Sequence, residues 1–128
     1  MTVFFVCAGL LGLLAVALTI NVGRMRHKKR INLGDGGDPE LLASIRAQGN
    51  LIELTPLCLL IIWLLHGPYG NRTIAILAVI LTVARFIHAG GMLGAVGMGR
   101  AVGSLATVLV LATASILLIL AGLSVRLY

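Results

Sequence analysis

Residues 3–22 read VFFVCAGLLGLLAVALTINV, and this uncharged run decides the fold class. Asn21 is its only strongly polar residue, and the run has the roughly 20 residues that a helix needs to cross a bilayer. No basic segment precedes it and the basic charges follow it, so its pattern is not that of a cleavable signal peptide. We therefore expect a membrane-spanning helix over about residues 3–23.

Three further apolar stretches follow, at about residues 39–66, 73–93 and 100–125. The chain is 59% hydrophobic and 11% charged, and its mean hydropathy is +1.09. Four crossings leave little of the 128 residues for a soluble domain. The sequence predicts one all-α domain over residues 1–128, an integral membrane four-helix bundle.

Local signals mark how these helices begin and are joined. Asp38 is a good N-cap and Pro39 fits the first position of the second helix. Pro56 lies inside that helix, where a kink is tolerated if neighbouring helices satisfy the freed carbonyl. We expect a tight turn at residues 67–71 and a glycine-rich connector at residues 94–99.

The net charge of +6 is unevenly distributed, which argues against nucleic acid as a partner. A concentration of lysine and arginine between two spans is typical of a cytoplasmic loop that meets anionic lipid head groups. Both termini then face the other side, with Arg126 and Tyr128 as interfacial anchors, as in a multi-pass protein of a bacterial inner membrane. Five of the ten basic residues lie in the loop after the first apolar run: Arg24, Arg26, Lys28, Lys29 and Arg30.

Cys7 and Cys58 both fall inside apolar segments, and neither has a CxxC partner. Buried cysteine usually behaves as a small hydrophobic residue. We expect no disulfide and no metal site.

Arg46, Asn50 and Glu53 share one face of the second helix, because they are four and then three residues apart, with Gln48 off this stripe. A carboxylate at membrane depth is costly, so Glu53 should face a partner, a cavity or another subunit. The stripe is either an internal network that joins helices or a binding site, and intramembrane charge favours the binding site.

Arg85 and His88 lie three residues apart near the cytoplasmic end of the third helix. Arg100 begins the fourth helix and Arg24 ends the first, so all four helices place polar groups at one membrane face. A cationic pocket with one carboxylate, Glu53, suits an anionic ligand that also carries an amino group.

The run RAQGNLIELTP at residues 46–56 resembles the second-helix signature of the MAPEG family (membrane-associated proteins in eicosanoid and glutathione metabolism). GDGGDPEL at residues 34–41 is similar to the linker of the bacterial branch, and RFIH at residues 85–88 and the later Arg100 fit the third and fourth helices. The resemblance covers essentially the whole chain.

This resemblance implies a homotrimer that binds glutathione, as co-substrate, between neighbouring subunits near the cytoplasmic face. By position, Arg46, Asn50 and Glu53 would hold glutathione, with Gln48 nearby. Arg85 and His88 would line the site. A cation beside a thiol lowers the thiol pKa from about 8.5 and so creates a nucleophile. Arg100 and Arg24 are the candidates for this thiolate-stabilising role, and Arg100 is the better match.

Three functions remain open. The first is a glutathione-dependent transferase or peroxidase that acts on lipophilic electrophiles from the bilayer. The second is a non-catalytic member that binds a lipid or another ligand, because residues 89–92 and Leu54 lack the tyrosines found in characterised members. The third is a small multidrug-type transporter, which Arg46 disfavours by holding Glu53 ionised.

Overall fold

The computed structural model describes residues 1–125 and contains, within them, four α-helices and no strand. The helices are α1 (Thr2–Lys29), α2 (Pro39–Leu64), α3 (His66–Met92) and α4 (Gly99–Val125). Each of the four is long and apolar enough to cross a membrane. The prediction of an all-α bundle of four spanning helices is confirmed. Arg126 and Tyr128, the predicted anchors, lie outside the described residues.

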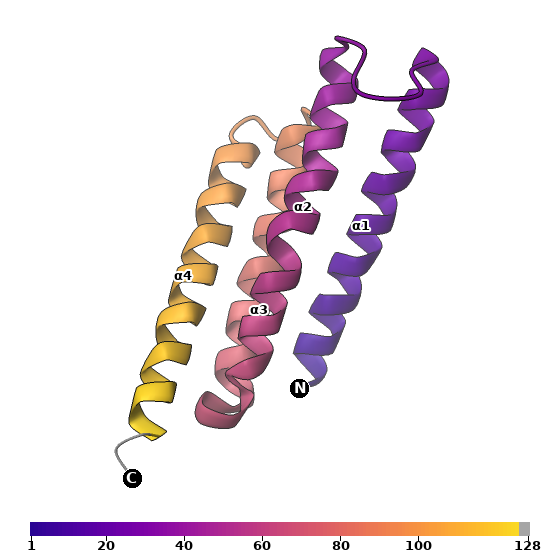
Figure 1. The fold of residues 1–128 in the computed structure, drawn as a ribbon. Helices are drawn as coiled ribbons and strands as arrows, with labels where there is room; N and C mark the ends of the chain where they lie inside the picture. Colours follow the sequence, from indigo (N-terminus) through magenta and orange to yellow (C-terminus); the bar gives the residue numbers. More distant parts are fainter. Residues whose placement is uncertain (126–128) are drawn as a thin grey trace.

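The four helices run side by side (Figure 1), with α3 in contact with each of the other three. The α1–α2 loop and the α3–α4 connector lie at one end of the bundle, and the N-terminus lies at the other end. Within residues 1–125, α1 and α4 do not contact each other, so α1 forms one edge of the protomer. Leu11, Leu51, Ile62 and Leu81 fill the interior between the helices.

Helix α1 extends about two turns beyond the predicted end, so four of the five clustered basic residues are helical. Arg30 follows in the left-handed region, with φ 56° and ψ 39°, and ends the helix. Cations in a last turn are stabilised by the negative end of the helix dipole, which explains why the helix does not stop at the first charge.

Helix α3 begins at His66 and includes the predicted turn at residues 67–71. Only Gly70 departs from helical geometry there, with φ 72° and ψ −179°. Pro68 is compatible with this early start because the first turn of a helix leaves its N–H groups unpaired anyway. The connection between α2 and α3 is therefore the single residue Leu65.

An ionic clamp joins the end of α1 to the start of α2. The ammonium group of Lys29 lies 2.6 Å from Asp38 Oδ1 and 2.7 Å from Glu40 Oε2. Asp38 also accepts a 2.8 Å hydrogen bond from the backbone N–H of Leu41, which confirms it as the N-cap of α2. The loop is further held by Arg26, which donates to the carbonyl oxygen of Gly34 at 2.6 Å.

Glycines allow α3 and α4 to touch through their backbones. A Cβ at Gly103 would fall 2.5 Å from both the carbonyl oxygen of Ala84 and the Cβ of His88. A Cβ at Gly91 would collide with the backbone nitrogen of Arg100. This close approach, which small residues permit in membrane bundles, places the start of α4 directly beside His88.

We predict that Gly103→Ala destabilises the protein by about 1–3 kcal/mol, because the added methyl group has no space between α3 and α4. Gly122→Ala is the matched control on the same helix, since a Cβ there meets nothing within 4 Å. The midpoint temperature of thermal unfolding, measured in detergent, should be lower for Gly103→Ala than for Gly122→Ala. Equal midpoint temperatures would contradict the explanation by close helix contact.

We also predict acid sensitivity of the α1–α2 clamp. The hydrogen bond from Lys29, followed by that from the Leu41 N–H, lowers the pKa of the Asp38 carboxyl. The stabilisation is therefore present above the ordinary aspartate pKa and is lost as pH falls through the lowered pKa. Asp38→Asn keeps a capping oxygen but removes the ion pair, so its stability should vary less between about pH 5 and pH 2. The free energy of unfolding of both proteins, measured across this pH range, tests the prediction. Parallel plots for wild type and Asp38→Asn would contradict it.

Candidate functional site

A cavity of about 380 Å³ opens between the start of α2, the end of α3 and the start of α4. It brings together side chains that are far apart in the sequence, and four of the predicted site residues are among them: Arg46, Asn50, His88 and Arg100. The remaining lining residues are Pro39, Leu42, Ala43, Met92 and Ser104.

The α2 stripe forms one wall of this cavity. Arg46 and Asn50 line it from successive turns of the helix. Glu53 lies one turn further along, with Oε1 3.8 Å from Arg46 Nη1, and both side chains are more than half exposed. An exposed ion pair of this kind contributes little stability. Both charges therefore remain available to a ligand.

Four predicted site residues do not line the cavity in the protomer, namely Arg24, Gln48, Glu53 and Arg85. Gln48 turns toward α1, where its Nε2 donates to Thr19 Oγ1 at 2.8 Å. Arg24 lies on α1 and borders a separate hollow. Of the two candidates for stabilising a thiolate, only Arg100 reaches the wall of the cavity.

Arg85 is fully buried, one turn deeper than His88 on the same face of α3. Its Nε and both Nη atoms have no hydrogen-bond partner among residues 1–125, and neither has His88 Nδ1. Arg85 does not line the cavity, but it lies one helical turn from His88, which does. The field of this buried cation therefore reaches the cavity wall.

None of the four acidic side chains, all of which lie within the described residues, compensates the charge of Arg85. The chain has four acidic residues. Asp38 and Glu40 bind Lys29, Glu53 pairs with Arg46, and Asp35 accepts from the Gly37 N–H in the loop. An unpaired buried cation is costly, and a cavity near several cations and one carboxylate is suited to a foreign anion.

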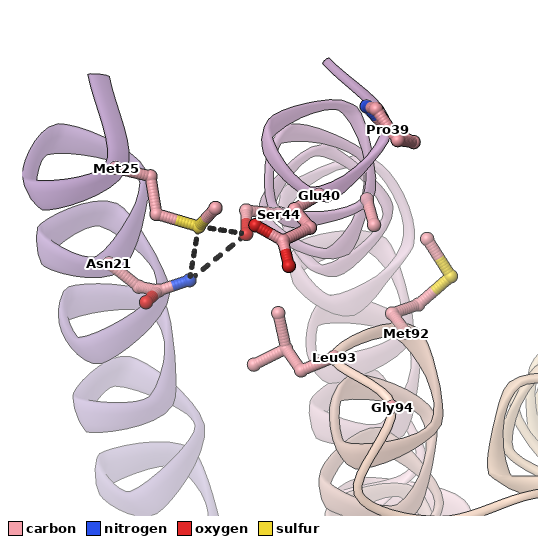
Figure 2. A pocket seen from close by; sticks show the side chains of 9 residues that line it. Asn21, Met25, Pro39, Glu40, Ser44, Met92, Leu93 and Gly94 are labelled. Carbon is pink, nitrogen blue, oxygen red and sulfur yellow. Dashed lines mark hydrogen bonds between the residues drawn. The ribbon is translucent and has the colours of Figure 1, made fainter. Parts of the chain in front are cut away.

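A second hollow, of about 520 Å³, lies between the end of α1, the start of α2 and the end of α3 (Figure 2). Asn21 donates to Ser44 Oγ at 3.1 Å, and the Ser44 hydroxyl donates to Met25 Sδ at 3.0 Å. These groups satisfy one another, and the Glu40 carboxylate borders the same space. It is less suited to an anion than the cavity beside α4. Sequence reasoning missed it, and its one signal was Asn21 in an otherwise apolar run.

Among residues 1–125, no tyrosine borders the cavity. Met92 occupies the wall, in the stretch where the family resemblance led us to look for tyrosine. Tyr69 lies near the opposite end of the bundle, where its hydroxyl donates to the carbonyl oxygen of Leu117 at 3.1 Å.

Fold and cavity together define a small multi-pass α-helical membrane protein with a cationic cavity at one end of the bundle. The model of the MAPEG family matches residues 4–120, so the chain belongs to that family. Two proteins named inner membrane protein YecN, from Escherichia coli strains K12 and O6:H1, are each 32% identical to it over 83 residues. Each match covers 63% of this chain and 63% of the relative, so the chain spans less than two thirds of those proteins.

We predict that Arg85→Met leaves the ligand-free protein as stable as wild type or more stable. The substitution removes an uncompensated buried charge and keeps a similar apolar volume, whereas truncating a buried side chain normally destabilises. Arg85→Ala, which also leaves a void, should be less stable than Arg85→Met. Thermal unfolding of the three proteins tests this. A large destabilisation by Arg85→Met would mean that the charge has a partner.

Proposed function

We propose that the protein is a membrane-bound glutathione-dependent transferase or peroxidase that acts on lipophilic electrophiles. The observation that carries this proposal is the convergence of Arg46, Asn50, His88 and Arg100 on one cavity. MAPEG membership supports the choice of glutathione among anionic ligands that carry an amine.

The residues present fit the charges of glutathione, which has two carboxylates, an ammonium group and a thiol. Arg46 and Arg100 would each pair with an anionic group of this ligand. Glu53, already 3.8 Å from Arg46, would receive the ammonium group. Asn50 offers both a donor and an acceptor for the peptide groups.

Arg100 is the residue that we assign to thiolate stabilisation. A guanidinium next to the thiol favours its charged form, which is the nucleophile. Glutathione would supply the sulfur: its thiolate would displace a leaving group from an electrophilic carbon. With a hydroperoxide, the thiolate would attack the terminal oxygen and break the O–O bond, which gives an alcohol and glutathione sulfenic acid, and a second glutathione would convert the sulfenic acid into the disulfide and water. The charge of Arg85 would add to the positive potential at the same wall, because Arg85 lies one helical turn from His88 in that wall.

The proposed assembly is a homotrimer in which the cavity lies near a subunit boundary. The Arg46–Glu53 pair is exposed on the protomer, so an adjoining copy would cover it and strengthen the charge interactions. Exposed apolar side chains on α2, among them Ile52, Leu57 and Leu60, provide a surface for lipid or subunit contact.

A non-catalytic ligand-binding protein is the second candidate. Met92 in the cavity wall favours it, because a thioether cannot donate the hydrogen bond that a tyrosine hydroxyl would give. A proton-coupled transporter is the least favoured candidate, because the cavity gathers the cations Arg46 and Arg100, which suit an anionic rather than a cationic substrate.

Titration of the protein with glutathione in nanodiscs near neutral pH tests the proposal. We expect a saturable thiolate absorbance band at about 240 nm, formed because cations depress the thiol pKa. Arg46→Ala and Arg100→Ala should each weaken binding by about 10- to 100-fold, the loss of one charged hydrogen-bonding partner. Arg72→Ala is the matched control, because Arg72 is exposed on the first turns of α3.

Calorimetric binding without the absorbance band would favour the non-catalytic protein. Absence of both would eliminate glutathione as the ligand of this cavity.

A further inference from the structure

The wall of the cavity beside α4 contains few groups that can exchange a proton with a ligand. Arg46 and Arg100 are permanently protonated, and Asn50 and Ser104 do not titrate near neutral pH. The other described lining residues, apart from His88, have apolar side chains. Histidine is the side chain whose ordinary pKa allows a change of charge between about pH 5 and 8. Within the described lining, His88 is therefore the one residue suited to accept and return a proton near neutral pH.

His88 is packed tightly between α3 and α4. The residue is only 1% exposed. A Cβ at Gly103 would lie 2.5 Å from the Cβ of His88, so α4 touches the base of this side chain. Arg100, one turn before Gly103, and Ser104, next to it, line the same cavity as His88. The imidazole therefore keeps a fixed position relative to Arg100, the residue assigned to the thiolate.

The surroundings of His88 favour a neutral ring. No carboxylate is among the described residues that line the cavity, so none is placed to hold the imidazole as a cation. The charged groups around it are Arg46 from α2, Arg100 from α4 and Arg85, one turn away on α3, while α1 contributes no described residue to the lining. Like charges disfavour a further cation among them. The resting imidazole thus has one ring nitrogen available as an acceptor.

We propose that His88 accepts the proton of the glutathione thiol and then passes it to the leaving group of the second substrate. This inference rests on the proposed function. The S–H bond breaks, its electron pair stays on the sulfur as the thiolate beside Arg100, and the proton moves to the imidazole. Nδ1 is enclosed and has no partner among residues 1–125, so the nitrogen that exchanges the proton is Nε2.

A proton held on His88 serves a substrate whose leaving group is basic. When the thiolate attacks the terminal oxygen of a hydroperoxide, the O–O bond breaks, and the leaving alkoxide takes up a proton to become an alcohol. His88 donates this proton and returns to its neutral form. A halide ion leaves an aryl carbon without needing a proton. The position of His88 therefore favours lipophilic hydroperoxides over aryl halides as the substrate class.

The test compares wild type with His88→Gln in nanodiscs, with glutathione and either cumene hydroperoxide or 1-chloro-2,4-dinitrobenzene as the second substrate. Glutamine keeps a hydrogen-bonding side chain but transfers no proton. Turnover of the hydroperoxide should fall by about 100-fold or more, because general acid–base catalysis contributes about 10²- to 10⁴-fold. Turnover of the aryl chloride should fall less. His66→Gln is the matched control, because His66 is exposed at the start of α3, where it stacks on Trp63.

The pH dependence separates the two proton transfers. At about pH 9, above the ordinary thiol pKa of about 8.5, the solvent removes the thiol proton without a base from the protein. Turnover of the aryl chloride by His88→Gln should then approach that of wild type, whereas turnover of the hydroperoxide should stay low. A second variant, His88→Ala, leaves space for a free imidazole molecule. Added imidazole should restore hydroperoxide turnover in His88→Ala and should not restore it in Arg100→Ala.

Equal losses with both substrates at every pH would overturn the inference, because His88 would then only position glutathione. Failure of imidazole to restore turnover in His88→Ala would also count against it. The proposed function has a separate test in the wild-type protein. Absence of calorimetric glutathione binding, or of turnover with either substrate, would overturn the proposed function and this inference together. Wild-type activity that is unchanged in His88→Gln would overturn this inference alone.

Discussion

The backbone contact between α3 and α4 controls where the charged groups of this protein lie. At Gly103, α4 approaches so closely that a single methyl group would meet His88 and the carbonyl of Ala84. That approach brings Arg100, at the start of α4, into the same cavity wall as His88 at the end of α3. A wider separation would disperse the cations around the rim of the bundle. Apolar burial alone does not fix the distance between α3 and α4, because apolar helix surfaces gain little by leaving lipid that is equally apolar.

The second constraint is the shortage of negative charge. Ten basic residues face four acidic ones, and the acidic ones are engaged at the loop, at the α1–α2 clamp and beside Arg46. Apart from Arg72 early in α3, the described cations that remain lie around the cavity beside α4 or at the end of α1. The start of α4 and the end of α1 both lie at the end of the bundle that holds the α1–α2 loop (Figure 1). In both places the chain leaves positive charge that its acidic side chains do not neutralise.

Hydropathy and spacing predicted the four helices, the N-cap Asp38 and the stripe of Arg46, Asn50 and Glu53. Other features depended on contacts that no single segment encodes. Helix α1 continues through its cations because the clamp at Lys29 and the helix dipole stabilise its last turns. Gln48 turns to α1 because Thr19 lies opposite it. The complete burial of Arg85 could not be predicted from the sequence either. Helical periodicity indicates the helix face on which a residue lies, but it does not indicate whether the side chain reaches a cavity.

Under the proposed function, Arg85 would link the stability of the bundle to the binding of its ligand. A leucine or methionine at this position would avoid the cost of a buried charge, and the close contact of α3 with α4 does not require a cation there. The guanidinium is nevertheless enclosed with every nitrogen unpaired among the described residues. An anion in the neighbouring cavity would offset part of that cost, and the gain would appear as affinity for the anion. Because the charge is removed from water, its effect on the ligand is screened far less by salt than that of the exposed Arg46. Ligand affinity should therefore retain a salt-independent component that originates in Arg85.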